Sequence, residues 1–276
     1  MSLTISGVRY LIISGKHYIS IKCLLVMCYN TATPNSAELR RYLKELLIKD
    51  YHIDNEFEER FNADGFARPF LPTVLSEAQD SIKLSQWKLI PHWVKTEAEA
   101  KKYANTLNAE GETIFEKASY RSSIPKRRGI LWVKGFYEPH KVPGVKETEN
   151  YFCYKEGGMI PIGIVYSPWT DQDTGEIKNT FSVITTKANP QFEVIHNEKK
   201  RMPLILEPKD FDQWFNTRER GEVEELIKPW EGELNAHQVV RITAMRNIDT
   251  NYADIQKPIG KRWVHGEGLK DNGSLF

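Results

Sequence analysis

The sequence predicts a single α+β domain built on a mostly antiparallel, barrel-like β-sheet with peripheral helices. Two observations support this fold class. Short segments rich in β-branched and aromatic residues dominate the chain after residue 130, and they do not alternate regularly with helices, as parallel βαβ units would. Across the 276 residues there is also no internal repeat, low-complexity tract or clear interdomain linker. A chain of this length can bury a continuous hydrophobic core.

The first elements differ in character. Segments 8–14 and 17–26 flank Gly15-Lys16 and are interpreted either as a hairpin or as upstream sequence absent from the mature protein. Segment 37–51 follows the polar residues Asn35-Ser36, and its apolar residues recur at helical spacing, so it is predicted to be a helix with a good N-cap. A second, short helix is predicted to begin at Thr96, because its first turn is acidic.

The remaining elements are mostly strands. Residues 170–175 form a predicted turn between two of them, and two short surface helices are predicted near the C-terminus, over 208–216 and 221–228. The predicted strands are 130–134, 159–167, 181–186, 203–206 and 238–245.

Composition limits the classes of function. The formal net charge is +1, so any binding of DNA must depend on a local basic patch. Cys23, Cys28 and Cys153 are too few and too irregularly spaced for a disulfide scaffold or a zinc site, so we expect a cytoplasmic protein without a metal. No stretch approaches the roughly 18 apolar residues that a membrane span needs, and a signal peptide is not predicted because charged residues interrupt the N-terminal segment.

Cys28 directly follows Met27, and an initiator methionine is readily removed before a small residue. If the mature chain began at Cys28, its α-amine and thiol would both be partly nucleophilic at neutral pH. Together they could condense with an aldehyde to a five-membered thiazolidine. The alternative is that Cys28 is a buried apolar residue, as free cysteines usually are.

Three further residues have side chains suited to a reaction at Cys28. The Asn108 amide, in a polar segment after a predicted helix, could orient a substrate or simply cap a turn. The Glu138 carboxylate follows an apolar run, where desolvation would raise its pKa toward the range useful for proton transfer, although it could equally be a surface group. The His196 imidazole titrates in the right range, but a histidine between apolar segments is more often a satisfied core residue.

Six short motifs resemble, in the same order, those of the SOS-response-associated peptidase family, the abasic-site processing proteins. The resemblance runs from Met27 to about Pro203, and each motif is weak alone whereas the ordered set is specific. The motifs are MCYN (27–30), WKLIPHW (87–93), LNAEGET (107–113), GFYEPH (135–140), VITTKAN (183–189) and VIHNEKKRMPLIL (194–206).

The resemblance implies a cysteine-dependent protein that binds single-stranded DNA and forms a thiazolidine crosslink with an abasic site. It also implies autoproteolytic removal of N-terminal residues, a hydrolase or lyase type of activity, with no cofactor, no membrane and no obligate protein partner. The positions that match the catalytic residues are Cys28, Asn108, Glu138 and His196. The expected DNA-binding residues are Trp93, Lys117, Arg121, Thr185 and Arg201.

Some positions depart from the family. Asn30 and Glu110 stand where relatives commonly have arginines, and Pro139 replaces an aromatic residue beside the carboxylate. The basic run that includes Lys126, Arg127 and Arg128 could compensate by following a phosphate backbone, or could be a solvated loop. Trp87 and Trp93 could stack on bases, although tryptophans at such spacing more often anchor a core. The resemblance favours Trp93 for stacking, because the family has an exposed aromatic residue at that position.

The N-terminal segment decides the mechanism. While residues 1–26 remain attached, the Cys28 nitrogen is an amide and cannot form an imine. We therefore expect an extension over 1–26, either upstream of the true translation start or a propeptide, followed by the domain over 27–276. A third alternative is that residues 1–26 remain attached and the protein is a divergent family member that binds DNA without a covalent bond. The rival functions are a thiol peptidase acting in trans through Cys28, His196 and Asn108, and a noncatalytic single-stranded DNA-binding module.

Overall fold

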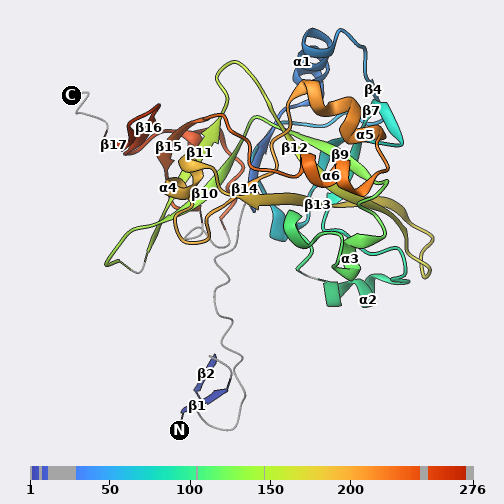
Figure 1. The fold of residues 1–276 in the computed structure, drawn as a ribbon, viewed down its shortest axis with the longest axis horizontal. Coiled ribbons are helices and arrows are strands. Elements are labelled where there is room, and N and C mark those ends of the chain that lie inside the picture. Colours follow the sequence, from blue (N-terminus) through green and yellow to red (C-terminus); the bar gives the residue numbers. More distant parts are fainter. Residues whose placement is uncertain are drawn as a thin grey trace.

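The computed structural model describes residues 2–5, 8–11, 29–103, 105–145, 147–242 and 248–271. Its core is a five-stranded barrel (Figure 1). Four antiparallel pairings join consecutive strands of the barrel, and a short parallel pairing closes it, with Thr180 opposite Gln86 and Phe181 opposite Trp87. The barrel strands, in spatial order, are β7 (Ala78–Trp87), β6 (Phe70–Leu75), β9 (Arg128–Val133), β12 (Ile160–Thr170) and β13 (Ile177–Lys187).

Both faces of the barrel wall are covered. In β9, Leu131 and Val133 belong to one apolar cluster, whereas Ile130 and Trp132 belong to a second cluster on the opposite face. A strand buried on both faces has an almost continuous apolar sequence. This explains why the segment from residue 130 could be identified from the sequence.

A second, antiparallel sheet adjoins the barrel, and its order is β17-β16-β15-β11-β10-β3-β5. The chain passes directly from β9 through Lys134 into β10, and the Lys134 amide donates to the Ala32 carbonyl at 2.7 Å. The strands are β3 (Asn30–Thr33), β5 (Arg60–Asp64), β10 (Gly135–Lys141), β11 (Thr148–Tyr154), β15 (Asn235–Val239), β16 (Arg262–Val264) and β17 (Gly268–Lys270). Three short strands, β4 (His52–Ile53), β8 (Asn108–Glu110) and β14 (Arg201–Pro203), extend the barrel sheet.

The helices are peripheral. The longest, α1 (Ser36–Leu47), begins with a capping box, in which the Asn35 side chain accepts from the Glu38 amide and the Glu38 carboxylate accepts from the Asn35 amide. In Figure 1, α2 and α3 lie on the opposite side of the barrel from α1. The other helices are α2 (Glu97–Ala100), α3 (Ala118–Arg121), α4 (Pro190–Ile195), α5 (Phe211–Asn216) and α6 (Arg220–Leu226). Short 3₁₀ turns cover Gly65–Ala67, Lys101–Tyr103, Gly111–Thr113, Pro208–Asp210 and Ala253–Gln256.

The predicted fold class is confirmed: the chain is one α+β domain with a barrel and a largely antiparallel second sheet. Three parallel pairings occur, β13 with β7, β13 with β8 and β4 with β7, but none is part of a βαβ unit. Both predicted N-terminal helices are present, with Asn35 and Thr96 as N-caps.

Several predicted boundaries need correction. The strand expected over 203–206 ends at Pro203, beyond which only Ile205 forms an isolated bridge. The helices expected at the surface near 208–228 bury Trp214 and Val223 against the barrel. Val8–Leu11 pairs with Ser2–Ile5, whereas the segment 17–26, its expected partner, lies outside the described residues.

Candidate active site

Glu138 and His196 form a buried pair. Glu138 lies on β10 and His196 caps the C-terminal end of α4, where its amide donates to the Phe192 carbonyl at 2.8 Å. Each residue is 1% exposed, and the His196 Nδ1 lies 3.4 Å from the Glu138 Oε2. Stacked rings of Phe136 and Phe192, with centroids 5.6 Å apart, hold α4 against β10. The structure thus brings into direct contact two residues that the sequence assigned to one site.

The environment of His196 fixes its protonation. Burial lowers the pKa of the imidazole, and the carbonyl of Arg201, which lies 3.1 Å from Nδ1, works in the opposite direction. Because a carbonyl only accepts hydrogen bonds, Nδ1 carries the proton. At neutral pH, His196 is therefore a neutral imidazole whose Nε2 has a free lone pair for accepting a proton.

The chain reaches this pair from the direction of Cys28, which itself lies outside the described residues. Strand β3 begins with Asn30 opposite Tyr137, the residue before Glu138. The Tyr29 carbonyl accepts from the Gly65 amide at 2.7 Å, and a Cβ on Gly65 would lie only 3.2 Å from that oxygen, so glycine eases this close approach. Because β3 and β10 are antiparallel, this register brings Tyr29, the residue after Cys28, beside Glu138 in the middle of β10.

Asn108 belongs to the same region. Strand β8 pairs in parallel with β13, with Asn108 opposite Val183, and the Asn108 carbonyl accepts from the Tyr120 hydroxyl at 3.0 Å. Burial raises the pKa of the Tyr29 hydroxyl, and a hydrogen bond with the Asn108 side chain opposes that rise. Asn108 therefore contacts the residue that follows Cys28.

Cys153 was not identified as a site residue from the sequence. It lies on β11 opposite Phe136, in a strand that the sequence did not reveal, and it is fully buried. Burial, and next the charge of Glu138, raises the pKa of its thiol well above the ordinary value. Cys153 therefore remains a neutral thiol and is a poor nucleophile. The alternation of β11, which places Tyr151 and Cys153 on one face, is the signal that could have located it.

The expected DNA-binding residues have different surroundings. Trp93 is 42% exposed, as expected for a stacking residue, and Arg121 is exposed in α3. Thr185 is buried, and both its carbonyl and its hydroxyl accept from the Arg201 Nη2, at 2.8 and 3.1 Å. Lys117 pairs with Glu110 at 3.1 Å, and Arg201 pairs with Glu112 at 2.7 Å.

The structure overturns the suggested role of Arg128 and decides for Trp87 in favour of the core alternative. Arg128 does not follow a phosphate backbone, because it is fully buried and donates to the carbonyls of Trp214, Ile124 and Thr217. Trp87 does not stack on bases, because it is fully buried and its indole donates to a main-chain carbonyl. Both residues organise the barrel.

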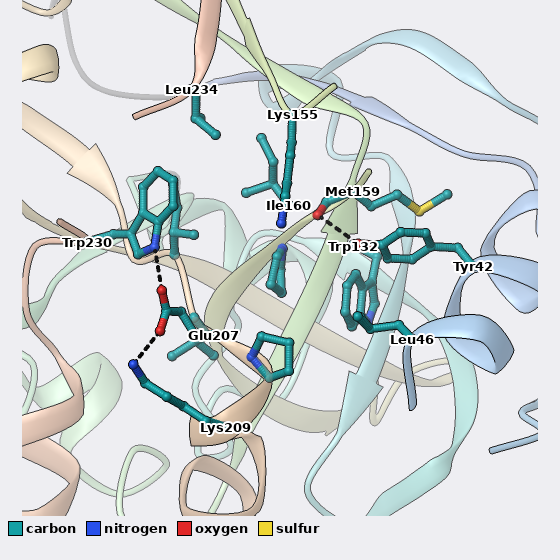
Figure 2. Close-up of a pocket in the computed structure, with 14 residues that line it drawn as sticks. Tyr42, Leu46, Trp132, Lys155, Met159, Ile160, Glu207, Lys209, Trp230 and Leu234 are labelled. Carbon is teal, nitrogen blue, oxygen red and sulfur yellow. Dashed lines mark hydrogen bonds and ion pairs between the residues drawn. The ribbon is translucent and has the colours of Figure 1, made fainter. Parts of the chain in front are cut away.

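A cavity of about 210 Å³ lies apart from these residues (Figure 2). The Glu207 carboxylate lies between the Trp230 indole, at 3.3 Å, and the Lys209 ammonium, at 2.5 Å, and Tyr42 and Trp132 form another part of its wall. Of the predicted catalytic and DNA-binding residues that the structure describes, none lines it. Within the described part of the chain, no cluster of acidic, histidine or cysteine side chains is suited to a metal ion, and no helix there has the length and apolar character of a membrane span.

The match to a family model covers residues 27–244, and the chain belongs to that family, SOS response associated peptidase (SRAP). It is 26% identical over 201 residues to the abasic site processing protein YoqW of Bacillus subtilis, covering 70% of this chain and 86% of YoqW. It is also 26% identical to the abasic site processing protein HMCES of Pongo abelii, covering 68% of this chain and 59% of HMCES.

A similar solved structure is that of a protein from Bacteroides thetaiotaomicron, with a TM-score of 0.73 and 27% identity. The superposition covers 84% of this chain and 100% of the Bacteroides thetaiotaomicron chain. A protein from Bordetella bronchiseptica, at 18% identity and a TM-score of 0.64, shares the fold.

Proposed function

We propose that this protein processes abasic sites in single-stranded DNA by forming a covalent thiazolidine between Cys28, as the N-terminal residue, and the abasic aldehyde. The buried contact between Glu138 and His196, beside Tyr29, carries the proposal. Membership in the family and the names of the relatives support the class of substrate.

The proposed reaction begins at the Cys28 amine. The nitrogen attacks the open-chain aldehyde carbon, and the carbinolamine loses water to give an imine. The Cys28 thiolate then adds to the imine carbon, which closes a ring of one sulfur, one nitrogen and three carbons. The net change is one molecule of water released per crosslink, with no oxidant or reductant.

Each of the other site residues has a proposed task. Glu138 transfers protons while the sugar ring opens and the carbinolamine loses water. His196, neutral and with a free Nε2, assists ring opening and the reversal of the crosslink. Asn108, through its contact with Tyr29, holds the amine and thiol in position. The neutral, buried Cys153 thiol does not compete with Cys28.

The proposal requires a free amine at Cys28, so residues 1–27 must be absent from the active protein. The family match covers 27–244, so its start at Met27 agrees with a domain that begins there. A start at Met27 followed by methionine removal, or autoproteolysis, would each expose Cys28.

The DNA is proposed to lie over the face that carries Trp93 and Arg121, which are both exposed. The DNA strand is proposed to be bordered by Lys117, Thr185 and Arg201. Thr185 would act through its hydrogen bond with Arg201.

The deciding experiment is a crosslinking assay on denaturing gels with a single-stranded oligonucleotide that contains one abasic site. It compares the 276-residue protein with a protein whose first residue is Cys28, after intact-mass measurement of both N-termini. We expect a slowly migrating covalent band only when Cys28 is the first residue, and none with Cys28→Ala. A band from the Cys28→Ala protein, or no band from a confirmed free Cys28, would refute the mechanism; cleavage of peptides in trans would instead support a thiol peptidase.

A further inference from the structure

Lys88 is a buried cation that the proposed mechanism does not use. It follows β7, its side chain is 1% exposed, and its Nζ makes no hydrogen bond with any described residue. The nearest anion is the Glu97 carboxylate, with Oε1 3.8 Å from Nζ, beyond hydrogen-bond distance. A buried ammonium that lacks hydrogen bonds is costly, so this arrangement requires a reason.

Lys88 lies within a group of cations. The charges of Arg68, Lys178 and Lys101, like burial itself, lower the pKa of its ammonium, whereas Glu97 alone opposes them. The Lys178 Nζ lies 3.6 Å from the Glu97 Oε2 and 3.3 Å from Glu176. Glu97 thus pairs with both Lys88 and Lys178, and Glu176 with Lys178, while Arg68 and Lys101 add positive charge that acts on Lys88. An excess of positive charge is typical of an anion-binding surface.

Glu97 occupies the place that an external anion would take. Its side chain is 43% exposed and belongs to α2, a helix of a single turn, so it can turn out toward solvent. Its Oε2 is buried and makes no hydrogen bond in the described chain, although it is an ion-pair partner of Lys178. An anion with several oxygens could satisfy both lysines better than this carboxylate does.

The cations are connected to the candidate active site through the chain. Tyr29 bonds to Gly65, and its ring lies 4.5 Å from that of Phe66, which is 64% exposed. Arg68 follows two residues later, and the Gln86 side chain, from the strand that leads into Lys88, donates to the Arg68 carbonyl at 3.5 Å. The exposed Trp93 lies on the loop between Lys88 and α2.

We infer that Arg68, Lys88, Lys101 and Lys178 form a phosphate-binding subsite for a phosphodiester of single-stranded DNA, and that Glu97 is a counter-ion which the phosphate displaces. This inference rests on the proposed function, because the subsite would bind a phosphate of the same DNA strand that reacts with Cys28. Phe66 and Trp93 are exposed and lie close in sequence to Arg68 and Lys88, and bases next to the bound phosphate would stack on such rings.

The test is noncovalent binding of the full 276-residue chain to a fluorescein-labelled oligothymidylate without an abasic site, followed by fluorescence anisotropy at several salt concentrations. Lys88→Met should weaken binding about tenfold and reduce the salt slope by about 0.7, the value for one lost phosphate contact on a single strand. Glu97→Gln should strengthen binding at least about threefold, because it removes the competing carboxylate. The matched control is Lys83→Met, also on β7 but paired with Asp54, which should bind like the wild type.

Thermal unfolding of each variant verifies that it is folded. Opposite changes in Lys88→Met and Glu97→Gln are required, and any other pattern in folded variants overturns the inference. Glu97→Gln keeps the test decisive if Lys88→Met does not fold, because an ion pair that only anchors α2 predicts no gain in affinity. Crosslinking at saturating DNA is scored separately, with Cys28 as the first residue. Its absence in the wild type refutes the proposed function, whereas unchanged noncovalent binding of the variants refutes the subsite.

Discussion

Replacing Glu138 by glutamine removes its proton-transfer capacity while keeping its size. The side chain is 1% exposed and contacts His196 at 3.4 Å, so little water can take over its task. General acid or base catalysis by a positioned side chain contributes about 10²- to 10⁴-fold to a rate. We expect Glu138→Gln to slow crosslinking by about 10²-fold or more.

The assay is single-turnover crosslinking at saturating abasic DNA, with Cys28 as the first residue, measured from pH 5 to 9. Saturation separates the chemical step from binding. The matched control is Glu149→Gln, on neighbouring β11, where the carboxylate accepts from the Tyr151 hydroxyl at 2.9 Å. Glu149→Gln should retain the wild-type rate. A Glu138→Gln rate within threefold of the wild type, with the same pH profile, would contradict the assigned role.

Three other predictions concern the supports of the site. Cys153→Ala should leave the crosslinking yield unchanged in the gel assay, since its thiol is neutral, and should cost about 1–2 kcal/mol of unfolding free energy through the small cavity left; loss of the crosslink would show that Cys153 takes part. Arg128→Met should cost about 3 kcal/mol or more in urea unfolding, because three buried carbonyls lose their donor; wild-type stability would contradict that structural role. Burial lowers the pKa of His196 and of His237 below the ordinary 6.5, so the unfolded chain binds more protons below that pH. Stability should therefore be constant just above pH 6.5 and fall as the pH drops from 6.5 toward 5; His196→Gln should reduce that fall, and an identical pH profile would refute the contribution of His196.

The strands that could be predicted from the sequence are those whose two faces are both buried. Strand β9 is buried on both faces and its apolar run is conspicuous. In β7 the pattern is weaker, because polar residues such as Asp80 and Lys83 alternate irregularly with buried ones such as Ile82. Strand β11 was missed, and Cys153 with it, because its first three residues, Thr148, Glu149 and Asn150, are all polar.

The motifs allowed the residues of the candidate site to be predicted, but not how those residues lie in space. The motifs identified Glu138 and His196, but their contact depends on α4 packing against β10, which no local pattern encodes. Arg128 was misinterpreted because a run of basic residues is normally solvated. Its burial depends on the carbonyls of Trp214 and Thr217, which are brought there by the tertiary fold.

The acidic residues of segment 107–113 have a consequence for DNA affinity. Glu110 pairs with Lys117 and Glu112 pairs with Arg201, so two of the five expected DNA contacts are already neutralised by the protein. Lys117 and Arg201 each already donate a hydrogen bond to their carboxylate partner, so exchanging that carboxylate for a phosphate gains little.

The double variant Glu110→Gln and Glu112→Gln should therefore bind single-stranded DNA more tightly, by about tenfold at low salt, and with a steeper salt dependence. Anisotropy with the same labelled oligothymidylate measures both quantities, and Glu116→Gln, whose carboxylate pairs with the remote Arg220 at 3.0 Å, is the control. Unchanged affinity in the double variant would place the DNA elsewhere. The predicted increase would mean that the protein gives up electrostatic affinity at these positions and depends on the covalent bond at Cys28 to retain damaged DNA.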